Sequence, residues 1–209
     1  MELHGISQDA FDLIVSEEVS SRKVYERKYQ HPEWPGGQSG VTVGIGFDCG
    51  YSSKNEIQDA WGDKLPKEMV ERLQFASGAK GERARVLTQH LKSQVTVPWD
   101  AAIDVFSNRD VPKYLSICEH TLPNFAKLSP DCKGAILSLV YNRGASFAND
   151  GDRYREMRAI KAHMESENFA AIPREFRSMK RLWPNVSGLV NRREHEALLF
   201  ERGLEAEAA

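Results

Sequence analysis

The sequence predicts a predominantly helical α+β protein in which a small β lobe packs beside a larger helical lobe. An amphipathic N-terminal helix, one glycine-rich segment with strand-like alternation, and repeated helix signals from residue 54 onward support this class. The 209 residues suit a single domain, 1–209. We expect the β lobe over about 22–52 and the helical lobe over about 1–21 and 53–203.

The first segment, from Ser7 to about residue 20, is expected to be helical because Ser7 can cap its first turn. Glu18 follows Ile14 by four residues and therefore falls on the same inward face, near the helix end. Loss of hydration favours the protonated form of a carboxylic acid, and that form can donate a proton. A solvated pair of helix-end charges, Glu17 and Glu18, is the structural alternative. The apolar face of this helix comprises Ile6, Ala10, Leu13 and Ile14.

The alternation of residue types over 41–48 predicts one half-buried strand. Small or polar residues are expected to share its outer face, and glycines there leave bare backbone for a polymer to lie against. A bulged strand packed on a helix explains the glycines equally well. The apolar positions are Val41, Val43, Ile45 and Phe47, and the alternating positions are Thr42, Gly44, Gly46 and Asp48.

Capping residues predict the helix boundaries in the rest of the chain. Pro98 and Asp100 start one helix, and the Ser-Pro-Asp run at 129–131 starts another that ends at Gly144. A last helix is expected over about Val186 to Arg202, closing at Gly203 and followed by a frayed tail, 204–209.

Composition excludes several classes of protein. The net charge is −2 and the isoelectric point is near 6.3, so a nucleic-acid partner is not expected. The apolar runs are too short for membrane insertion. Cys49, Cys118 and Cys132 form no CxxC pair, so we expect reduced, partly buried thiols, with no metal and no cofactor.

Two further motifs carry chemistry-bearing side chains. The helix Ala135–Gly144 ends by presenting an aromatic ring and an amide together, at Tyr141 and Asn142. Sugars stack on aromatic rings and satisfy their hydroxyl groups on amides. In the segment Gly188–Glu196, the adjacent residues Arg192 and Arg193 cannot both face solvent in the same direction, and an inward arginine needs an anionic partner such as Glu18. Each motif, taken by itself, is also compatible with a structural role.

The order and spacing of these motifs resemble those of the phage-type lysozymes, and more closely the branch that includes pesticin-like muramidases. In that family an N-terminal helix ends in the catalytic Glu, and a Tyr follows seven residues later. A TxGxG strand, an ALxSxxFNxG helix and a terminal GLxxRRxxE helix complete the pattern. The resemblance runs from about residue 6 to 203, and its positions here are Glu18, Tyr25, Thr42–Gly46, Ala135–Gly144 with Tyr141 in place of Phe, and Gly188–Glu196.

The resemblance implies a lysozyme-like glycoside hydrolase that cuts peptidoglycan glycan strands between N-acetylmuramic acid and N-acetylglucosamine. We expect the protein to be a monomer. It implies that Glu18 is the proton donor and that Thr42 positions a water or the substrate. Arg192 (or Arg193) would orient or tune Glu18, with Tyr25 in support. The residues expected in the sugar groove are Gly46, Tyr141 and Asn142.

The second carboxylate departs from the family pattern. The simpler pattern has an Asp nine residues after the catalytic Glu, where this chain has Arg27. Asp48, Glu26 and Glu33 are the candidates, and we rank Asp48 above Glu26 because it shares the face of Thr42. Six strand residues span roughly 20 Å if straight, so the strand must bend at one of its glycines for Asp48 to act.

A catalytically inactive wall-binding or structural lysozyme-like module is the alternative function, and a chitinase or chitosanase on the same scaffold is a third. Residues 1–5 show no secretory signal, so we expect synthesis in the cytoplasm and action on the cell wall after delivery. The delivered protein would be a phage endolysin or the catalytic part of a secreted antibacterial effector. We favour the effector, which would need a delivery domain and a cognate immunity protein.

Overall fold

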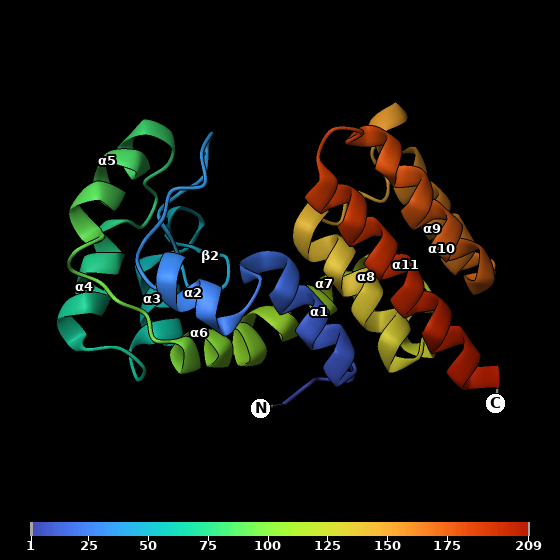
Figure 1. Ribbon diagram of the computed structural model, residues 1–209, viewed down its shortest axis with the longest axis horizontal. Coiled ribbons are helices and arrows are strands. Elements are labelled where there is room, and N and C mark those ends of the chain that lie inside the picture. The colour runs from blue at the N-terminus through green and yellow to red at the C-terminus, as the bar shows by residue number, and fades with distance from the viewer. Residues whose placement is uncertain (1, 209) are drawn as a thin grey trace. The chain divides into compact units, whose positions relative to one another are not determined.

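A computed structural model describes residues 2–208, and it confirms a predominantly helical α+β fold with one small antiparallel sheet (Figure 1). The chain divides into two compact units. We call residues 18–110 the hairpin unit, and residues 2–17 with 111–208 the helical unit. Helix α1, Gln8–Val19, contributes its last two residues to the hairpin unit.

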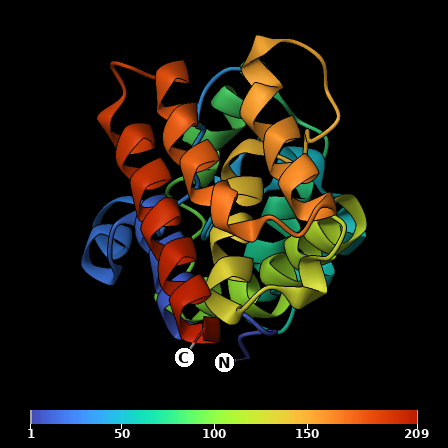
Figure 2. The same cartoon turned by 90° about the vertical axis from the view of Figure 1, so that its right-hand side faces the viewer.

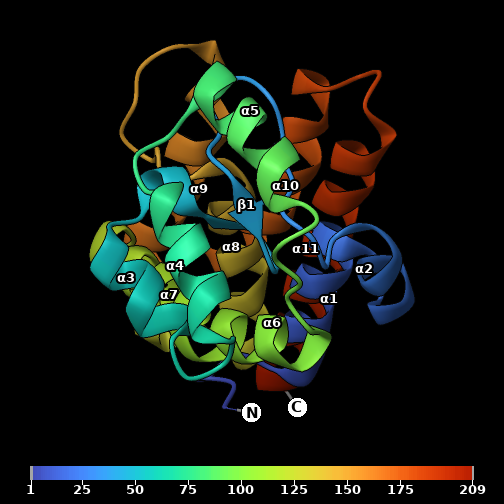
Figure 3. The ribbon, with the colours of Figure 1, turned by 90° about the vertical axis from the view of Figure 1, so that its left-hand side faces the viewer.

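The hairpin unit holds a two-stranded sheet among short helices (Figure 3). A 3₁₀ turn, Cys49–Tyr51, follows the sheet, and a π-helical turn, Phe106–Asp110, ends the unit. Its regular elements are α2 Arg22–Lys28, β1 Thr42–Val43, β2 Phe47–Asp48, α3 Lys54–Trp61, α4 Lys67–Phe75, α5 Gly81–Leu91 and α6 Trp99–Val105.

The prediction of one strand over 41–48 was wrong, because the segment folds into a hairpin. Thr42 pairs with Asp48 and Val43 with Phe47 in antiparallel register. Gly44 and Gly46 reverse the chain with φ of +61° and +80°, a left-handed backbone that glycine adopts without steric cost. The predicted bend at the glycines is therefore confirmed, in the stronger form of a full turn.

The apolar alternation of the same segment is confirmed. Trp61 of α3 lies against the Phe47 ring, with 5.5 Å between ring centroids in an edge-to-face arrangement. At Gly44 an added Cβ would come within 2.9 Å of the Trp61 ring, so this position admits only glycine without rearrangement. The side chains that anchor the hairpin in the core are Val41, Val43, Ile45 and Phe47, each at most 3% exposed.

The helical unit consists of packed helices joined by short 3₁₀ turns (Figure 2). Helix α8 packs on both α7 and α11, and α10 packs on α11. At Gly134 of α8 an added Cβ would meet the Ala10 Cβ at 2.1 Å, so the glycine allows α1 to approach α8 closely. With the first part of α1, the helices of this unit are α7 Val111–Thr121, α8 Pro130–Arg143, α9 Arg155–Glu165, α10 Ile172–Ser178 and α11 Ser187–Ala208.

Capping side chains form the predicted helix starts. The Ser7 hydroxyl accepts a hydrogen bond from the Ala10 backbone N–H at 3.0 Å, and Ser129 caps α8 through the Cys132 N–H at 3.3 Å. Gly144 ends α8 with φ of +78°. The prediction that the last helix closes at Gly203 was wrong, since α11 continues through it to Ala208 and the tail is helical over the described residues.

Gly203 serves close packing and does not cap a helix. An added Cβ would meet Ser129 Oγ at 2.5 Å and Cys132 Sγ at 2.7 Å. A glycine near the end of a helical pattern is compatible with both uses, and capping was the wrong choice here.

Two carboxylates of the helical unit are fully buried and bonded to arginines. Glu196 on α11 accepts a hydrogen bond from the Ser138 hydroxyl of α8 at 2.6 Å and lies 2.8 Å from Arg193 Nε. Glu156 on α9 accepts hydrogen bonds from Arg181 Nε at 2.7 Å and from the Ser178 hydroxyl at 2.9 Å. Both groups link one helical segment to another.

The three cysteines are free and buried. Burial raises the pKa of Cys49 well above its ordinary value and that of Cys118 to about 12, so neither is a reactive thiolate near neutral pH. Within residues 2–208, no helix is long and apolar enough to cross a membrane, and no group of three or more His, Cys, Asp or Glu side chains is placed to hold a metal ion.

Candidate functional site

A cavity of about 380 Å³ lies in the hairpin unit and brings together the end of α1, the hairpin and the loop before it. Its volume falls within the range of small-molecule sites. Carboxylates, a hydroxyl, aromatic rings and bare glycine backbone all line it. The lining residues are Glu18, Val19, Tyr29, Glu33, Trp34, Pro35, Thr42, Gly44 and Gly46.

Glu18 reaches this cavity because α1 ends there. It is the penultimate residue of the helix, and the chain turns at Ser20, whose φ is +64°. Its neighbour Val19 is buried, while Glu18 itself is half-buried. The carboxyl group is therefore partly removed from solvent yet accessible from the cavity, as a proton donor to a bound substrate must be.

Backbone pairing places Thr42 beside Glu33. The Glu33 N–H donates to the Thr42 carbonyl at 2.9 Å, and the Thr42 N–H donates to the Glu33 carbonyl at 2.8 Å. This bridge adds a third short segment to the edge of the hairpin. The Thr42 hydroxyl is half-buried and makes a long contact of 3.4 Å with the Gly40 carbonyl. That weak contact leaves the hydroxyl able to bind a water or a substrate group.

The Glu33 carboxylate is held at the cavity by a cation. Lys92, at the C-terminal end of α5, places its Nζ 2.6 Å from Glu33 Oε1. Both side chains are partly exposed, so the pair orients the carboxylate more than it stabilises the fold.

A second set of contacts holds the chain between α2 and the hairpin. The Tyr25 hydroxyl donates to the Val97 carbonyl at 2.9 Å, and its ring packs edge-to-face on Trp99. Burial raises the pKa of Tyr25, so its hydroxyl stays protonated and remains a donor. The Val97 N–H in turn donates to the Gln30 carbonyl at 2.7 Å. Tyr25 thus anchors the segment that brings Tyr29 to the cavity. Its supporting role in catalysis stays a prediction.

The two predicted second acids do not line the cavity among the described residues. Both Asp48 carboxylate oxygens accept backbone hydrogen bonds, from Gly40 N–H at 3.0 Å and from Gly50 N–H at 2.8 Å. This arrangement closes the loop around the hairpin. Glu26 lies on the exposed face of α2, paired with Arg22 at 2.8 Å. The third candidate, Glu33, is the one whose side chain lines the cavity with Glu18.

The remaining predicted site residues belong to the helical unit. The Tyr141 ring packs against the Tyr114 ring, with 4.8 Å between the ring centroids. The Asn142 side-chain oxygen accepts a hydrogen bond from Arg193 at 3.2 Å. Arg192 is buried, and its Nη2 donates to the Ser138 carbonyl at 3.1 Å. Their roles in sugar binding and in tuning Glu18 stay predictions.

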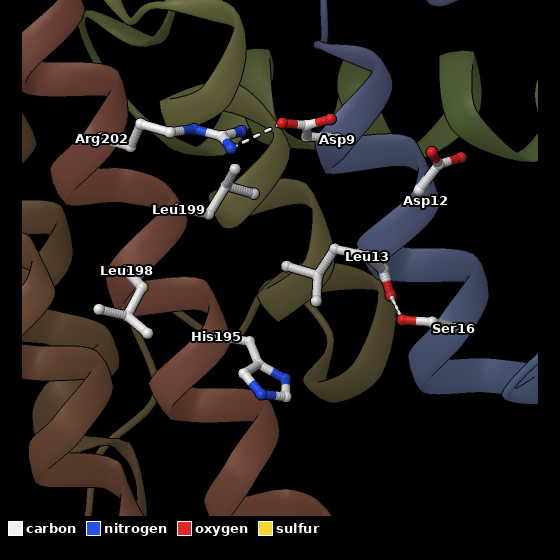
Figure 4. A pocket seen from close by; sticks show the side chains of 8 residues that line it. All are labelled: Asp9, Asp12, Leu13, Ser16, His195, Leu198, Leu199 and Arg202. Atoms are coloured by element: carbon white, nitrogen blue, oxygen red, sulfur yellow. Dashed lines mark hydrogen bonds and ion pairs between the residues drawn. The ribbon is translucent and has the colours of Figure 1, made fainter.

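A larger cavity, of about 620 Å³, lies between α1 and α11 within the helical unit (Figure 4). Its walls carry Leu198 and His195 beside several charged groups. Arg202 Nη1 lies 2.6 Å from Asp9 Oδ2, and Asp12 accepts a hydrogen bond from the Gln8 side-chain amide at 2.8 Å. These exposed carboxylates are engaged on helix surfaces, so the hollow does not offer the acid, hydroxyl and bare backbone found beside Glu18.

Sequence reasoning missed three residues of the cavity region: Tyr29, Trp34 and Lys92. The Pro-Glu-Trp-Pro-Gly-Gly run at 32–37 stood out only as a longer loop. The sequence feature that could have indicated a binding loop is the acid and tryptophan between two prolines, since such residues in a rigid loop often serve binding.

The site belongs to a chain with a recognisable family relationship. The family profile for pesticin, described as a bacterial toxin homologue of phage lysozyme, C-terminal part, matches residues 9–158. Glu18, Thr42 and the whole cavity lining fall inside the matched segment. A comparison with curated protein sequences gives no match for this chain.

Proposed function

Because the chain belongs to the pesticin family of phage-lysozyme homologues, we propose that it is a muramidase that hydrolyses peptidoglycan glycan strands, with Glu18 as the proton donor. One observation carries the proposal: Glu18, Glu33 and Thr42 line a single cavity with aromatic rings and bare glycine backbone. Glycoside hydrolysis needs such a pair of carboxyl groups on either side of the bond that breaks.

Each group has a chemical role in the proposed reaction. Glu18 donates its proton to the oxygen that joins the two sugars, and this oxygen leaves with the departing sugar as a hydroxyl group. The Glu33 carboxylate supplies negative charge for the oxocarbenium-like transition state, and Lys92 keeps that carboxylate at the cavity. The Thr42 hydroxyl orients the attacking water or a substrate group. The water oxygen bonds to the sugar carbon that has lost the leaving oxygen, and a carboxylate of the pair accepts the proton that the water loses.

The family description, a bacterial toxin homologue, favours an antibacterial effector over a phage endolysin as the setting for this activity. In either setting the enzyme acts on the wall from outside the cytoplasm. A delivery domain and a cognate immunity protein stay predictions.

The test compares Glu18→Gln with Glu17→Gln on purified sacculi. The amide has nearly the same shape but is not an acid and cannot transfer a proton to the leaving oxygen, so release of reducing ends should fall at least about 100-fold. Glu17 is the adjacent carboxylate, bonded to His195 at 2.8 Å, and its variant should retain parental activity. Mass spectrometry of the products must find N-acetylmuramic acid at the new reducing ends. Lysis by Glu18→Gln at the parental rate would refute the assignment.

A further inference from the structure

The loop over residues 32–37 brings a tryptophan to the cavity and holds it in one orientation. The Trp34 indole N–H donates to the Ser39 carbonyl at 3.1 Å, and the same carbonyl accepts the Gly81 N–H at 3.1 Å, at the start of α5. Gly36 and Gly37 turn the chain with positive φ, and the Ser39 N–H closes the turn onto the Gly36 carbonyl at 3.1 Å.

Two backbone bridges fix the ends of this loop. Glu33 is paired with Thr42 on the hairpin, and Gly40 is paired with Lys80 before α5. The proline on either side of the Glu33–Trp34 dipeptide further restricts the backbone. The Trp34 ring is therefore preorganised, and a ligand that uses it loses little conformational entropy on binding.

The polar group of this ring is already satisfied within the loop. Trp34 is half-exposed and lines the cavity that contains Glu18, so it meets a ligand mainly with its π surface. A π surface is suited to a flat apolar partner. The apolar C–H face of a pyranose ring has that character, while its hydroxyl and acetamido groups need the polar atoms that also line the cavity.

We infer that Trp34 is a sugar-binding platform, which holds an N-acetylhexosamine ring of the glycan next to the bond that Glu18 protonates. The inference rests on the proposed glycan hydrolysis. A platform that contacts the sugar equally before and during reaction contributes to binding and leaves the chemical step unchanged. Changes at Trp34 should therefore raise KM and leave kcat nearly constant.

The test measures binding to the Glu18→Gln protein, which keeps the ligand intact, with the N-acetylglucosamine tetramer as the probe in calorimetry. Trp34→Phe and Trp34→Leu both lose the indole hydrogen bond, and only Phe retains an aromatic face. We expect Trp34→Leu to weaken binding about tenfold and Trp34→Phe about threefold or less.

Phe75→Leu is the matched control. Phe75 is an exposed aromatic residue of the hairpin unit that does not line this cavity, so its variant should bind within twofold of the Glu18→Gln protein. Equal weakening by Trp34→Phe and Trp34→Leu, parental affinity of Trp34→Leu, or no binding of the tetramer would each overturn the inference. If the parent released no reducing ends while Trp34-dependent binding persisted, the proposed hydrolysis would fail and the sugar platform would stand.

Discussion

Carboxylates of the hairpin unit and of the helical unit are held in opposite ways. Glu18, at the end of α1, and Glu33, in the loop before the hairpin, line one cavity, and both side chains are half-buried. Glu156 and Glu196 are buried on helices and surrounded by arginine and serine donors. The first arrangement leaves the carboxyl group accessible for chemistry, and the second uses its charge to join helices.

The comparison teaches that burial of an acid in this fold does not by itself make the acid accessible to a ligand. Glu196 is fully buried, and its oxygens interact with Ser138, Arg192 and Arg193. A group in such a network cannot meet a substrate without breaking several bonds. A half-buried acid at the end of a helix, such as Glu18, lines a cavity that a ligand can enter.

Replacing Glu156 by Gln should give the largest change in stability. Burial raises the pKa of Glu156, but hydrogen bonds from Arg181, its own backbone, Ser178 and Arg155 outweigh burial and lower it to about 2. The ionised carboxylate therefore contributes roughly 3 kcal/mol to the free energy of unfolding at neutral pH. Glu156→Gln should lose most of this contribution in urea titrations at pH 7.

The same group predicts a pH dependence with a definite sign. Its pKa is lower in the folded state, so its contribution is complete above the unfolded value of about 4.5 and is lost as the pH falls toward 2. Parent and variant should converge in stability over that interval. Glu165→Gln, at an exposed position on the same helix, should match the parent throughout, and a constant difference between Glu156→Gln and the parent down to pH 2 would contradict the argument.

Glu33→Gln should show the reverse effect, with little loss of stability and a large loss of activity. We expect kcat to fall about 100-fold, since the variant lacks the charge that faces the transition state. Asp48→Asn is the informative comparison. Its side chain binds two backbone amides, so it should lower stability by about 1 kcal/mol and reduce activity in proportion to unfolding. If a stably folded Asp48→Asn protein lost kcat completely, Asp48 and not Glu33 would be the second catalytic carboxylate.

The fold class and several elements could be predicted because they depend on local chemistry. Ser7, Ser129 and Gly144 mark helix ends through hydrogen bonds and dihedrals to near neighbours. The alternation over 41–48 also identified the buried positions correctly. It could not identify the hairpin. Every second residue is buried in one continuous strand, and the same alternation arises in two short strands joined by a tight turn.

Which candidate acid lines the cavity depends on contacts distant in the sequence and was harder to predict. Asp48 was predicted to share the face of Thr42 on one strand, whereas it pairs with Thr42 across the hairpin. The amides that bind it come from Gly40 and Gly50, whose positions depend on the folded loop. Glu33 reaches the cavity through backbone pairing with Thr42 and an ion pair with Lys92, 59 residues along the chain. No local pattern encodes such a contact.

A last prediction concerns the hairpin turn that lines the cavity. Gly44→Ala should lower the free energy of unfolding by about 2 kcal/mol, because alanine disfavours the left-handed backbone and its Cβ meets the Trp61 ring. Gly78→Ala is matched to it, with φ of +74° and no atom within 4 Å of the added Cβ, so it should cost only about 1 kcal/mol. Thermal unfolding measures the loss in free energy of unfolding for each variant, and the difference between the two losses is the contribution of the contact between the added Cβ and Trp61. Equal losses would show that backbone conformation accounts for the whole effect.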